Sequence, residues 1–423
     1  EYDMYGRPDN IYNTPPAELK TVSVMLPLSG PHAEIGRGIS NSIQMAFLKN
    51  RYNNVAVQFY NLTGNKYEKH GIIMGALATE PDIIIGPVFA EDAAMVRDLK
   101  PETLPVLTFS SDTSAIGNGV MTMALIPSQS VEMIVREMDR DGASNFIVMA
   151  PKSTSGEQMA GAAQYAADLY NVTLSGIFYY DEGNSDSIKI ASQRAAMYTA
   201  RNEANTKARE ILSDIMVKEP VTQTQKANME RQLEKISKSE TLGRVPYNAI
   251  LFLGNASDTK QIASFLRYYD VAARDARFYG TTLWDGSELL KDYSFVGSKY
   301  ATLPPISTVF AETFESVSGK KASRLDTFGY DAANLVIGML HSNKLPAAYL
   351  LDPSGYNGLD GLFRLTPNGA SERALEIVEL NGSGTSRLAK PAATDFLAPI
   401  YNINPRKISR ASEMGLVAAG INP

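Results

Sequence analysis

Short apolar runs alternate with longer amphipathic stretches along most of the chain. The run Thr21–Leu26 predicts a buried strand, and after a Leu-Ser-Gly-Pro turn the positions Ile35, Ile39 and Ile43 mark one face of a helix. The alternation continues with strands predicted at Val55–Tyr60, Asp82–Ile85 and Pro105–Phe109 and helices at His70–Thr79 and Glu91–Leu99. Continuous apolar strands separated by amphipathic helices are typical of a parallel sheet covered on both faces.

The same pattern starts again after Ile126-Pro127. The second series is predicted as helices at Val131–Arg140, Glu157–Tyr170 and Asp258–Tyr268 and strands at Asn145–Ala150, Val172–Tyr179, Ala249–Leu253 and Arg277–Tyr279. The break at Leu303-Pro304-Pro305 and a strand at Gly358–Arg364 indicate two further crossovers. We therefore expect an α/β protein with two doubly wound parallel-sheet lobes joined by three crossover strands.

The break points and the returning helices at Ser307–Val317 and Thr327–His341 set the expected domain boundaries. A leader occupies residues 1–19, and a C-terminal tail rich in Gly, Ser and Pro occupies residues 382–423. Lobe one comprises residues 20–126 and 305–357, and lobe two comprises residues 127–304 and 358–381.

A charged stretch within lobe two, Ser187–Thr241, differs from the rest of the chain. It is rich in Ala, Lys, Glu, Arg and Gln and has Pro220 as its only breaker, so it predicts two solvent-facing helices. Two interpretations stay open, a solvated helical hairpin and a surface that docks a partner.

Composition narrows the classes of partner and chemistry. Forty Lys and Arg against 46 Asp and Glu give a net charge of −6, without the clustered basic surface that binding to nucleic acid requires. No window approaches the ~20 apolar residues of a transmembrane segment, so any signal peptide or lipid anchor belongs to the precursor. The absence of Cys excludes disulfides, thiol nucleophiles and zinc-thiolate sites.

Ligands of doubly wound sheets bind at the strand-to-helix loops, because helix N-termini present unpaired N–H groups there. In lobe one these loops contain His32, Val88, Phe89 and the run Ser110-Ser111-Asp112-Thr113. The hydroxyl groups of that run can hold a carboxylate, and Asp112 can accept from an ammonium or from sugar hydroxyls. Helix capping is an equally good interpretation of the same residues.

The corresponding loops of lobe two contain four further candidates. They are Ser155, Asn255, Thr282 and Trp284. Trp284, the single tryptophan, can stack on a ligand, although a packed core or hinge position is the commoner role.

Neither catalysis nor metal binding is expected. The three histidines, His32, His70 and His341, lack the i, i+4 spacing of a helical metal site. The chain also lacks G-x-S-x-G, P-loop and G-x-G-x-x-G motifs, so we expect no catalytic residues and no cofactor.

Several segments together resemble the type I periplasmic binding proteins of the leucine/isoleucine/valine-binding kind, across about Lys20 to Leu380. They are V-M-L-P-L-S-G-P-H-A-E-I-G, I-I-I-G-P-V-F-A and P-V-L-T-F-S-S-D-T. The segments L-F-L-G-N-A-S-D, L-R-Y-Y-D-V and F-Y-G-T-T-L-W-D, preceded by the charged insertion, look more like the penicillin-binding-protein activators of proteobacteria. Those relatives are outer-membrane lipoproteins that stimulate peptidoglycan synthases.

The resemblance implies a ligand cleft between the lobes, with differences from the amino-acid binders. Ser110 to Thr113 match the small hydroxyl residues of that family, but Thr281 and Thr282 stand where a carboxylate is expected, and Asn255 replaces a cleft aromatic. A buried ammonium without a counter-charge is costly, which weakens the case for a zwitterionic amino acid. We therefore expect a periplasmic, non-catalytic binding module that regulates peptidoglycan synthases. The alternative is the receptor of an ABC importer, which delivers a small polar ligand to a permease.

Overall fold

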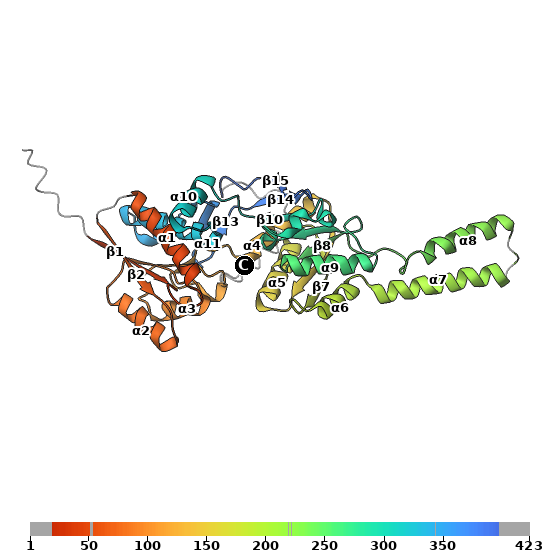
Figure 1. The fold of residues 1–423 in the computed structure, drawn as a ribbon, viewed down its shortest axis with the longest axis horizontal. Coiled ribbons are helices and arrows are strands. Elements are labelled where there is room, and N and C mark those ends of the chain that lie inside the picture. The colour runs from red at the N-terminus through yellow and green to blue at the C-terminus, as the bar shows by residue number, and fades with distance from the viewer. Residues whose placement is uncertain (1–18, 51–53, 219, 221, 343, 397–423) are drawn as a thin grey trace, which may run out of the picture. The chain divides into compact units, whose positions relative to one another are not determined.

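The computed structural model describes residues 19–50, 54–218, 220, 222–342 and 344–396, which form two compact units (Figure 1). Unit 1 contains the described residues up to Ile126, Pro304–Ala374 and the segment from Ala393, and unit 2 contains Pro127–Leu303 and Leu375–Ala392. The chain thus crosses at Ile126-Pro127, Leu303-Pro304 and Ala374-Leu375 and returns at Ala392-Ala393. The expected leader up to residue 18 and the expected tail beyond residue 396 lie outside the described residues.

Unit 1 is built on five parallel strands in the order β2-β1-β3-β4-β5. These strands are β1 (Lys20–Leu26), β2 (Val55–Asn61), β3 (Ile83–Ile85), β4 (Val106–Thr108) and β5 (Val120–Thr122). The connecting helices are α1 (Ala33–Asn50), α2 (Lys66–Leu77) and α3 (Ala90–Leu99), and a 3-10 turn, η2 (Thr113–Ala115), follows β4. Strands β3, β4 and β5 are buried at every position, because helices cover both faces of the sheet.

The rest of unit 1 combines helices with a small antiparallel sheet. Its helices are α10 (Thr308–Ser318), α11 (Arg324–His341) and α12 (Pro346–Leu350), and its sheet has the order β11 (Tyr356–Gly358), β12 (Gly361–Leu365) and β13 (Ser371–Arg373). Helix α11 packs along α1 and begins at a capping box formed by Ser323 and Asp326. The boundary differs from the expected one here, because β12 and β13 lie in unit 1 and the third crossing follows them.

Unit 2 contains a seven-stranded sheet in the order β15-β14-β10-β9-β8-β6-β7. Its strands are β6 (Asn145–Pro151), β7 (Thr173–Tyr180), β8 (Ala249–Phe252), β9 (Arg277–Gly280), β10 (Lys299–Thr302), β14 (Glu376–Leu380) and β15 (Ser386–Lys390). Strands β10, β9, β8, β6 and β7 are parallel, and β14 and β15 add an antiparallel edge. Residues 386–390, within the expected tail, form that edge strand. Two parallel α/β sheets therefore confirm the predicted fold class.

Helices cover the unit 2 sheet, and an aromatic cluster lies beneath them. The helices are α4 (Pro127–Arg140), α5 (Thr154–Leu169), α6 (Ser185–Ala195) and α9 (Ala256–Tyr268), with 3-10 turns η3 (Thr282–Trp284), η4 (Glu288–Lys291) and η5 (Tyr293–Phe295). Trp284 is fully buried and its ring lies 5.7 Å from Phe295 and 6.1 Å from Tyr300. Gly280 provides the space, because a Cβ there would lie 2.3 Å from the indole.

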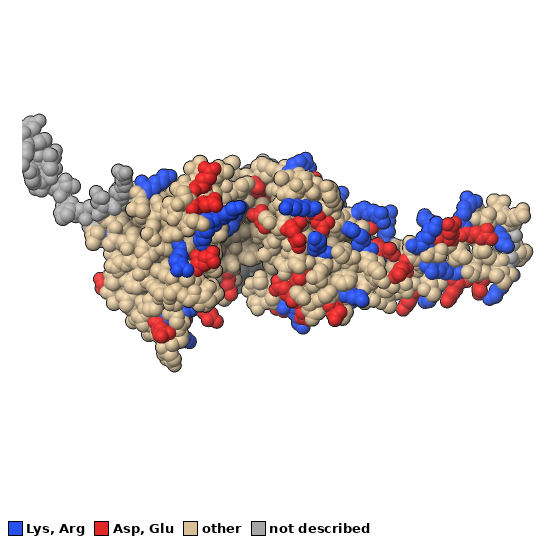
Figure 2. Space-filling view, viewed as in Figure 1, with Lys and Arg blue, Asp and Glu red and all other residues tan. Residues whose placement is uncertain are grey.

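A helical hairpin of α7 (Tyr198–Lys218) and α8 (Gln223–Ser237) forms most of the charged insertion of unit 2 (Figure 1). No residue of α8 is buried, and α7 buries only Arg201 and Asn205, both near its base. Figure 2 shows positive and negative side chains interspersed along these helices. The hairpin is shorter than the predicted insertion, because α6 packs into the unit 2 core through Ile188, Ala191 and Ala195. Among the described helices, none is long and apolar enough to cross a membrane.

Candidate functional site

The carboxyl ends of β1, β2 and β3 in unit 1 surround a cavity of about 710 Å³. His32 and Phe89, both predicted ligand residues, line it with ring centroids 4.8 Å apart and planes 58° from parallel. An ion pair joins Lys69 Nζ and Asp92 Oδ1 at 2.7 Å in the same wall, where Asp92 is 3% exposed. The cavity therefore combines a pair of aromatic faces with a fixed polar wall, which suits a small polar ligand.

The loop that carries Val88 and Phe89 lies close to β1. Gly86 precedes it with a φ of +99°, and a Cβ there would lie 2.1 Å from the carbonyl oxygen of Met25. Only glycine fits this approach. Val88 is 8% exposed and packs under the loop, while Phe89 is half-buried beside the cavity.

The run of hydroxyl residues after β4 is partly occupied by its own loop. Asp112 Oδ1 accepts from the backbone N–H of Ser114 at 2.9 Å, which caps η2, and Ser110 Oγ accepts from the backbone N–H of Asp112 at 3.2 Å. These contacts are those of the capping interpretation. Ser111 and Thr113 are exposed, so their hydroxyl groups remain accessible to a ligand.

In unit 2 the predicted residues lie at the carboxyl ends of β6, β8 and β9. Ser155 is exposed in the first turn of α5, which Ser153 caps. Asn255 caps α9, accepting from the backbone N–H of Asp258 at 2.8 Å, and its amide donates to Glu182 at 2.8 Å. Thr282 is half-buried in η3. Trp284 is fully buried in the core, which is the commoner of the two roles predicted for it, so its ring is not exposed to a ligand.

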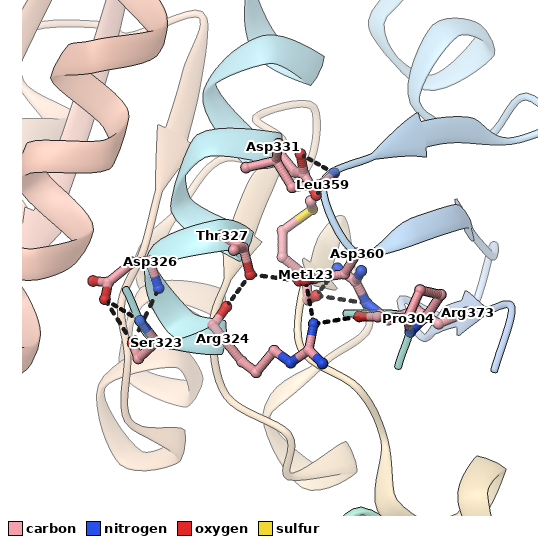
Figure 3. Close-up of polar contacts among 10 residues, drawn as sticks. All are labelled: Met123, Pro304, Ser323, Arg324, Asp326, Thr327, Asp331, Leu359, Asp360 and Arg373. Atoms are coloured by element: carbon pink, nitrogen blue, oxygen red, sulfur yellow. Dashed lines mark hydrogen bonds and ion pairs between the residues drawn. The ribbon is translucent and has the colours of Figure 1, made fainter. Parts of the chain in front are cut away.

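A buried polar cluster in unit 1 holds the backbone next to the three crossings (Figure 3). Arg373 donates to the carbonyl of Met123, and Ser371 donates to the carbonyl of Ala124, both shortly before the first crossing. Arg324 Nη1 donates to the carbonyl of Pro304 at 2.7 Å, at the second crossing. Arg373 itself is followed directly by the third crossing. The unit 1 ends of the crossings are thus fixed to one another.

Carboxylates compensate the two guanidinium groups of this cluster. Asp360 is fully buried, accepts from Arg324 Nη1 at 2.5 Å and also accepts from the hydroxyl of Thr327 (Figure 3). Burial lowers the pKa of Arg373 to about 10 and raises the pKa of Asp331 to about 7. Sequence reasoning missed Arg324, Asp331, Asp360 and Arg373. In the sequence these residues stand out only as charged positions within otherwise apolar segments. That pattern does not distinguish a buried charged side chain from a solvated one.

Within the described residues, no group of three or more His, Asp or Glu side chains could hold a metal ion.

A family model described as "LppC putative lipoprotein" matches residues 9–376. No curated protein matches the sequence significantly. A Rhodospirillum rubrum protein described as a "putative branched-chain amino acid ABC transporter" shares 15% identity and a TM-score of 0.65, over 88% of this chain and 99% of that chain. The LpoA (YraM) C-domain of Haemophilus influenzae, a regulator of PBP1A, shares 15% identity and a TM-score of 0.59, over 88% of this chain and 100% of that chain.

A solute-binding protein of an ABC transporter from R. palustris, solved in complex with benzoate, shares 14% identity and a TM-score of 0.51, over 90% of this chain and 99% of that chain. These similar structures are binding proteins and a regulator, and they share the type I periplasmic binding protein fold predicted from the sequence. The chain belongs to the LppC lipoprotein family and has that fold.

Proposed function

We propose that this protein is a non-catalytic periplasmic regulator of a peptidoglycan synthase, attached to the outer membrane as a lipoprotein. The observation that carries the proposal is the family match over residues 9–376, together with the likeness to the complete LpoA C-domain. LpoA is described as a regulator of PBP1A, and the family as one of lipoproteins, so both the partner class and the anchor follow by analogy. The altered ligand loops, with Asn255 and Thr282 in place of an aromatic and an acid, also favour a role other than amino-acid uptake.

Purified synthase and purified full-length chain test this proposal directly. We expect the class A penicillin-binding protein of the same organism to be retained by the immobilised chain and to make peptidoglycan faster in its presence. A matched chain of similar fold, such as an amino-acid-binding protein of the same cell, serves as the control. If an active synthase were neither retained by the chain nor stimulated by it, the proposal would be contradicted.

The second candidate is the receptor of an ABC importer, favoured by the unit 1 cavity with His32 and Phe89. In this role the predicted loop residues bind a small polar solute. A melting panel of amino acids and small polar solutes on refolded, ligand-free protein tests it, because saturation at 100 times Kd adds about 2.7 kcal/mol of stability. A clear shift with one solute supports the receptor, and a flat panel supports the regulator.

A further inference from the structure

Unit 1 contains a second cavity, of about 300 Å³, that shares no residue with the cavity of the ligand loops. It lies between the middle of α11, helix α12 and strand β11. The residues that matter for its chemistry are Tyr330, Asp331, Tyr349, Tyr356, Asn357 and Phe363. The polar cluster of Figure 3 includes Asp331, which faces this cavity as one of its lining residues.

Asp331 is a buried carboxyl group with few hydrogen-bond donors. It is 5% exposed, and within the described residues the backbone N–H of Leu359 is the one donor that contacts it, at 3.0 Å from each oxygen. A carboxylate has about four lone-pair sites, so one N–H donor leaves most of them open. The backbone of Gly358 lies close to this carboxyl group, since a Cβ there would lie 2.3 Å from Oδ2. The carboxylate form can therefore accept hydrogen bonds from a further donor.

Aromatic rings form the wall next to this carboxyl group. The ring centroids of Tyr349 and Tyr356 lie 5.5 Å apart, and those of Tyr356 and Phe363 lie 5.9 Å apart. Tyr330, the neighbour of Asp331 on α11, lines the cavity as well. Aromatic faces together with a buried carboxylate attract organic cations, because the faces carry negative potential and the carboxylate supplies the counter-charge. An ammonium brings three donors and a guanidinium five.

Tyr330 and Leu359 also line a largely apolar groove of about 520 Å³ between α1 and α10, which Lys49 lines as well. Leu48 and Val309 line this groove and are 74% and 72% exposed. A ligand that fills both spaces has a cationic head and an apolar stem.

We propose that this cavity binds an ammonium or guanidinium group on an apolar stem, with Asp331 as its counter-ion. The site is independent of the proposed regulatory role and of the ligand loops. The cation source is either a free amine or a lysine or arginine side chain, since both offer the same head group.

Binding of such a cation competes with protonation of Asp331. Burial raises the pKa of Asp331 to about 7, the guanidinium of Arg373 on β13 lowers it and Asp360 raises it. The other titratable groups facing the cavity are the phenols of Tyr330, Tyr349 and Tyr356. Since only the ionised carboxyl group attracts the cation, affinity at pH 6 is about tenfold lower than at pH 8.

Isothermal titration of the full chain with n-butylammonium tests the proposal. We expect a Kd on the order of 1 mM at pH 8, about tenfold weaker binding at pH 6 and no binding of butan-1-ol, which has the same stem without the charge. A terminally blocked Leu-Lys-Leu peptide tests the side-chain source, and tighter binding than butylammonium identifies a polypeptide ligand. Absence of binding by both cations at pH 8 overturns the proposal.

Two carboxyl variants locate the site. Asp331→Asn keeps an acceptor for the Leu359 N–H and is expected to abolish binding, whereas Asp98→Asn, at an exposed acid of the same unit, is expected to leave it unchanged. Binding that survives in D331N, or is lost in D98N, overturns the assignment. Asn357→Lys, at an exposed residue of the cavity rim, provides a variant that does not disturb the core; its own ammonium is expected to block the added amine.

Discussion

At the scale of single residues, Asp331 shows how an ordinary helix position becomes unusual through tertiary burial. It lies in the apolar face of α11 and accepts from a backbone amide of the turn after β11. In sequence it is an acid between Tyr330 and Ala332, and a solvated helix face presents the same pattern. The same holds for Asp360 and Arg373, so the cluster of Figure 3 was not predictable from residue type. The candidate ligand residues could be chosen from the sequence because alternating strands and helices predict a parallel sheet. The loops that follow parallel strands lie at one edge of such a sheet.

The raised pKa of Asp331 makes the stability of unit 1 dependent on pH. The folded state holds the Asp331 proton up to about pH 7, against an ordinary value of 3.8, so the unfolded state binds fewer protons in between. Stability from this group is therefore highest at low pH and falls as the pH rises, on the order of 2 to 3 kcal/mol between pH 5 and 8. Asp331→Asn cannot ionise, so this part of the pH dependence disappears.

Urea unfolding followed by circular dichroism at pH 5, 6, 7 and 8, without added amine, measures the effect. The difference between the wild type and D331N isolates the one group, because all other titrating groups are shared. Equal pH slopes in the two proteins would mean that Asp331 is ionised in the folded state at low pH.

At the scale of elements, apolar runs predicted the parallel strands well and the element ends less well. Helix α2 begins at Lys66 instead of the expected His70, because Asn65 and Glu68 form a capping box that the periodicity did not reveal. Helix α11 begins at Arg324 instead of Thr327 for the same reason, with Ser323 as its cap. The short antiparallel strands β11, β13 and β15 have no clear pattern of their own, since their partners in the sheet decide their register.

The α7–α8 hairpin is fastened at its base by three polar side chains. Arg201 is 8% exposed and donates to the carbonyls of Ala196, Gly243 and Tyr269, and Asn205 and Arg209 each donate to the carbonyl of Ser239. Along the rest of the hairpin, both helices carry half-buried apolar residues. Those residues are Leu212, Ile215 and Met216 on α7 and Met229, Leu233 and Ile236 on α8. We therefore expect the part of the hairpin beyond its base to contribute little to the stability of unit 2.

Replacement of residues 210–235 by a short Gly-Ser-Gly linker tests this separation. The stability of unit 2 is expected to change by less than about 1 kcal/mol, because the replaced parts of α7 and α8 contain no buried residue. Arg201→Ala serves as the contrast and is expected to cost about 2 to 4 kcal/mol, because it leaves buried carbonyl groups unpaired. Melting of both variants provides the measurement, and a large loss in the linker variant would show that the hairpin supports the core. A linker variant that is stable but no longer stimulates the synthase would assign partner docking to the hairpin.

At the scale of the whole molecule, the repeated strand-helix order predicted two lobes, and the quoted segments predicted the family. The finer division between the units was harder, because the chain crosses several times and short segments such as β12 and β15 have too few residues to show which sheet they join. Each unit also contains a buried apolar cluster of its own. One buried cluster contains Met25, Ile84 and Val106 of unit 1, and another contains Phe252, Trp284 and Phe295 of unit 2. Units with separate cores can unfold separately.

The single tryptophan allows this independence to be measured. Trp284 is fully buried in unit 2, so its emission reports the unfolding of that unit, while circular dichroism reports both units. Asp360→Ala removes the buried carboxylate that pairs with Arg324 in unit 1 and is expected to cost about 2 to 3 kcal/mol there, because the half-buried guanidinium of Arg324 and the buried hydroxyl of Thr327 lose their charged acceptor. In one urea titration of D360A, part of the change in circular dichroism should therefore occur at a lower urea concentration, while the tryptophan transition keeps its midpoint.

Asp98→Ala, at an exposed acid of the same unit paired with Arg97, is the control. It should change the free energy of unfolding seen by either signal by no more than about 1 kcal/mol. If the tryptophan transition of D360A shifted together with the dichroism, the two units would unfold as one cooperative structure, and the cluster at the crossings would stabilise both.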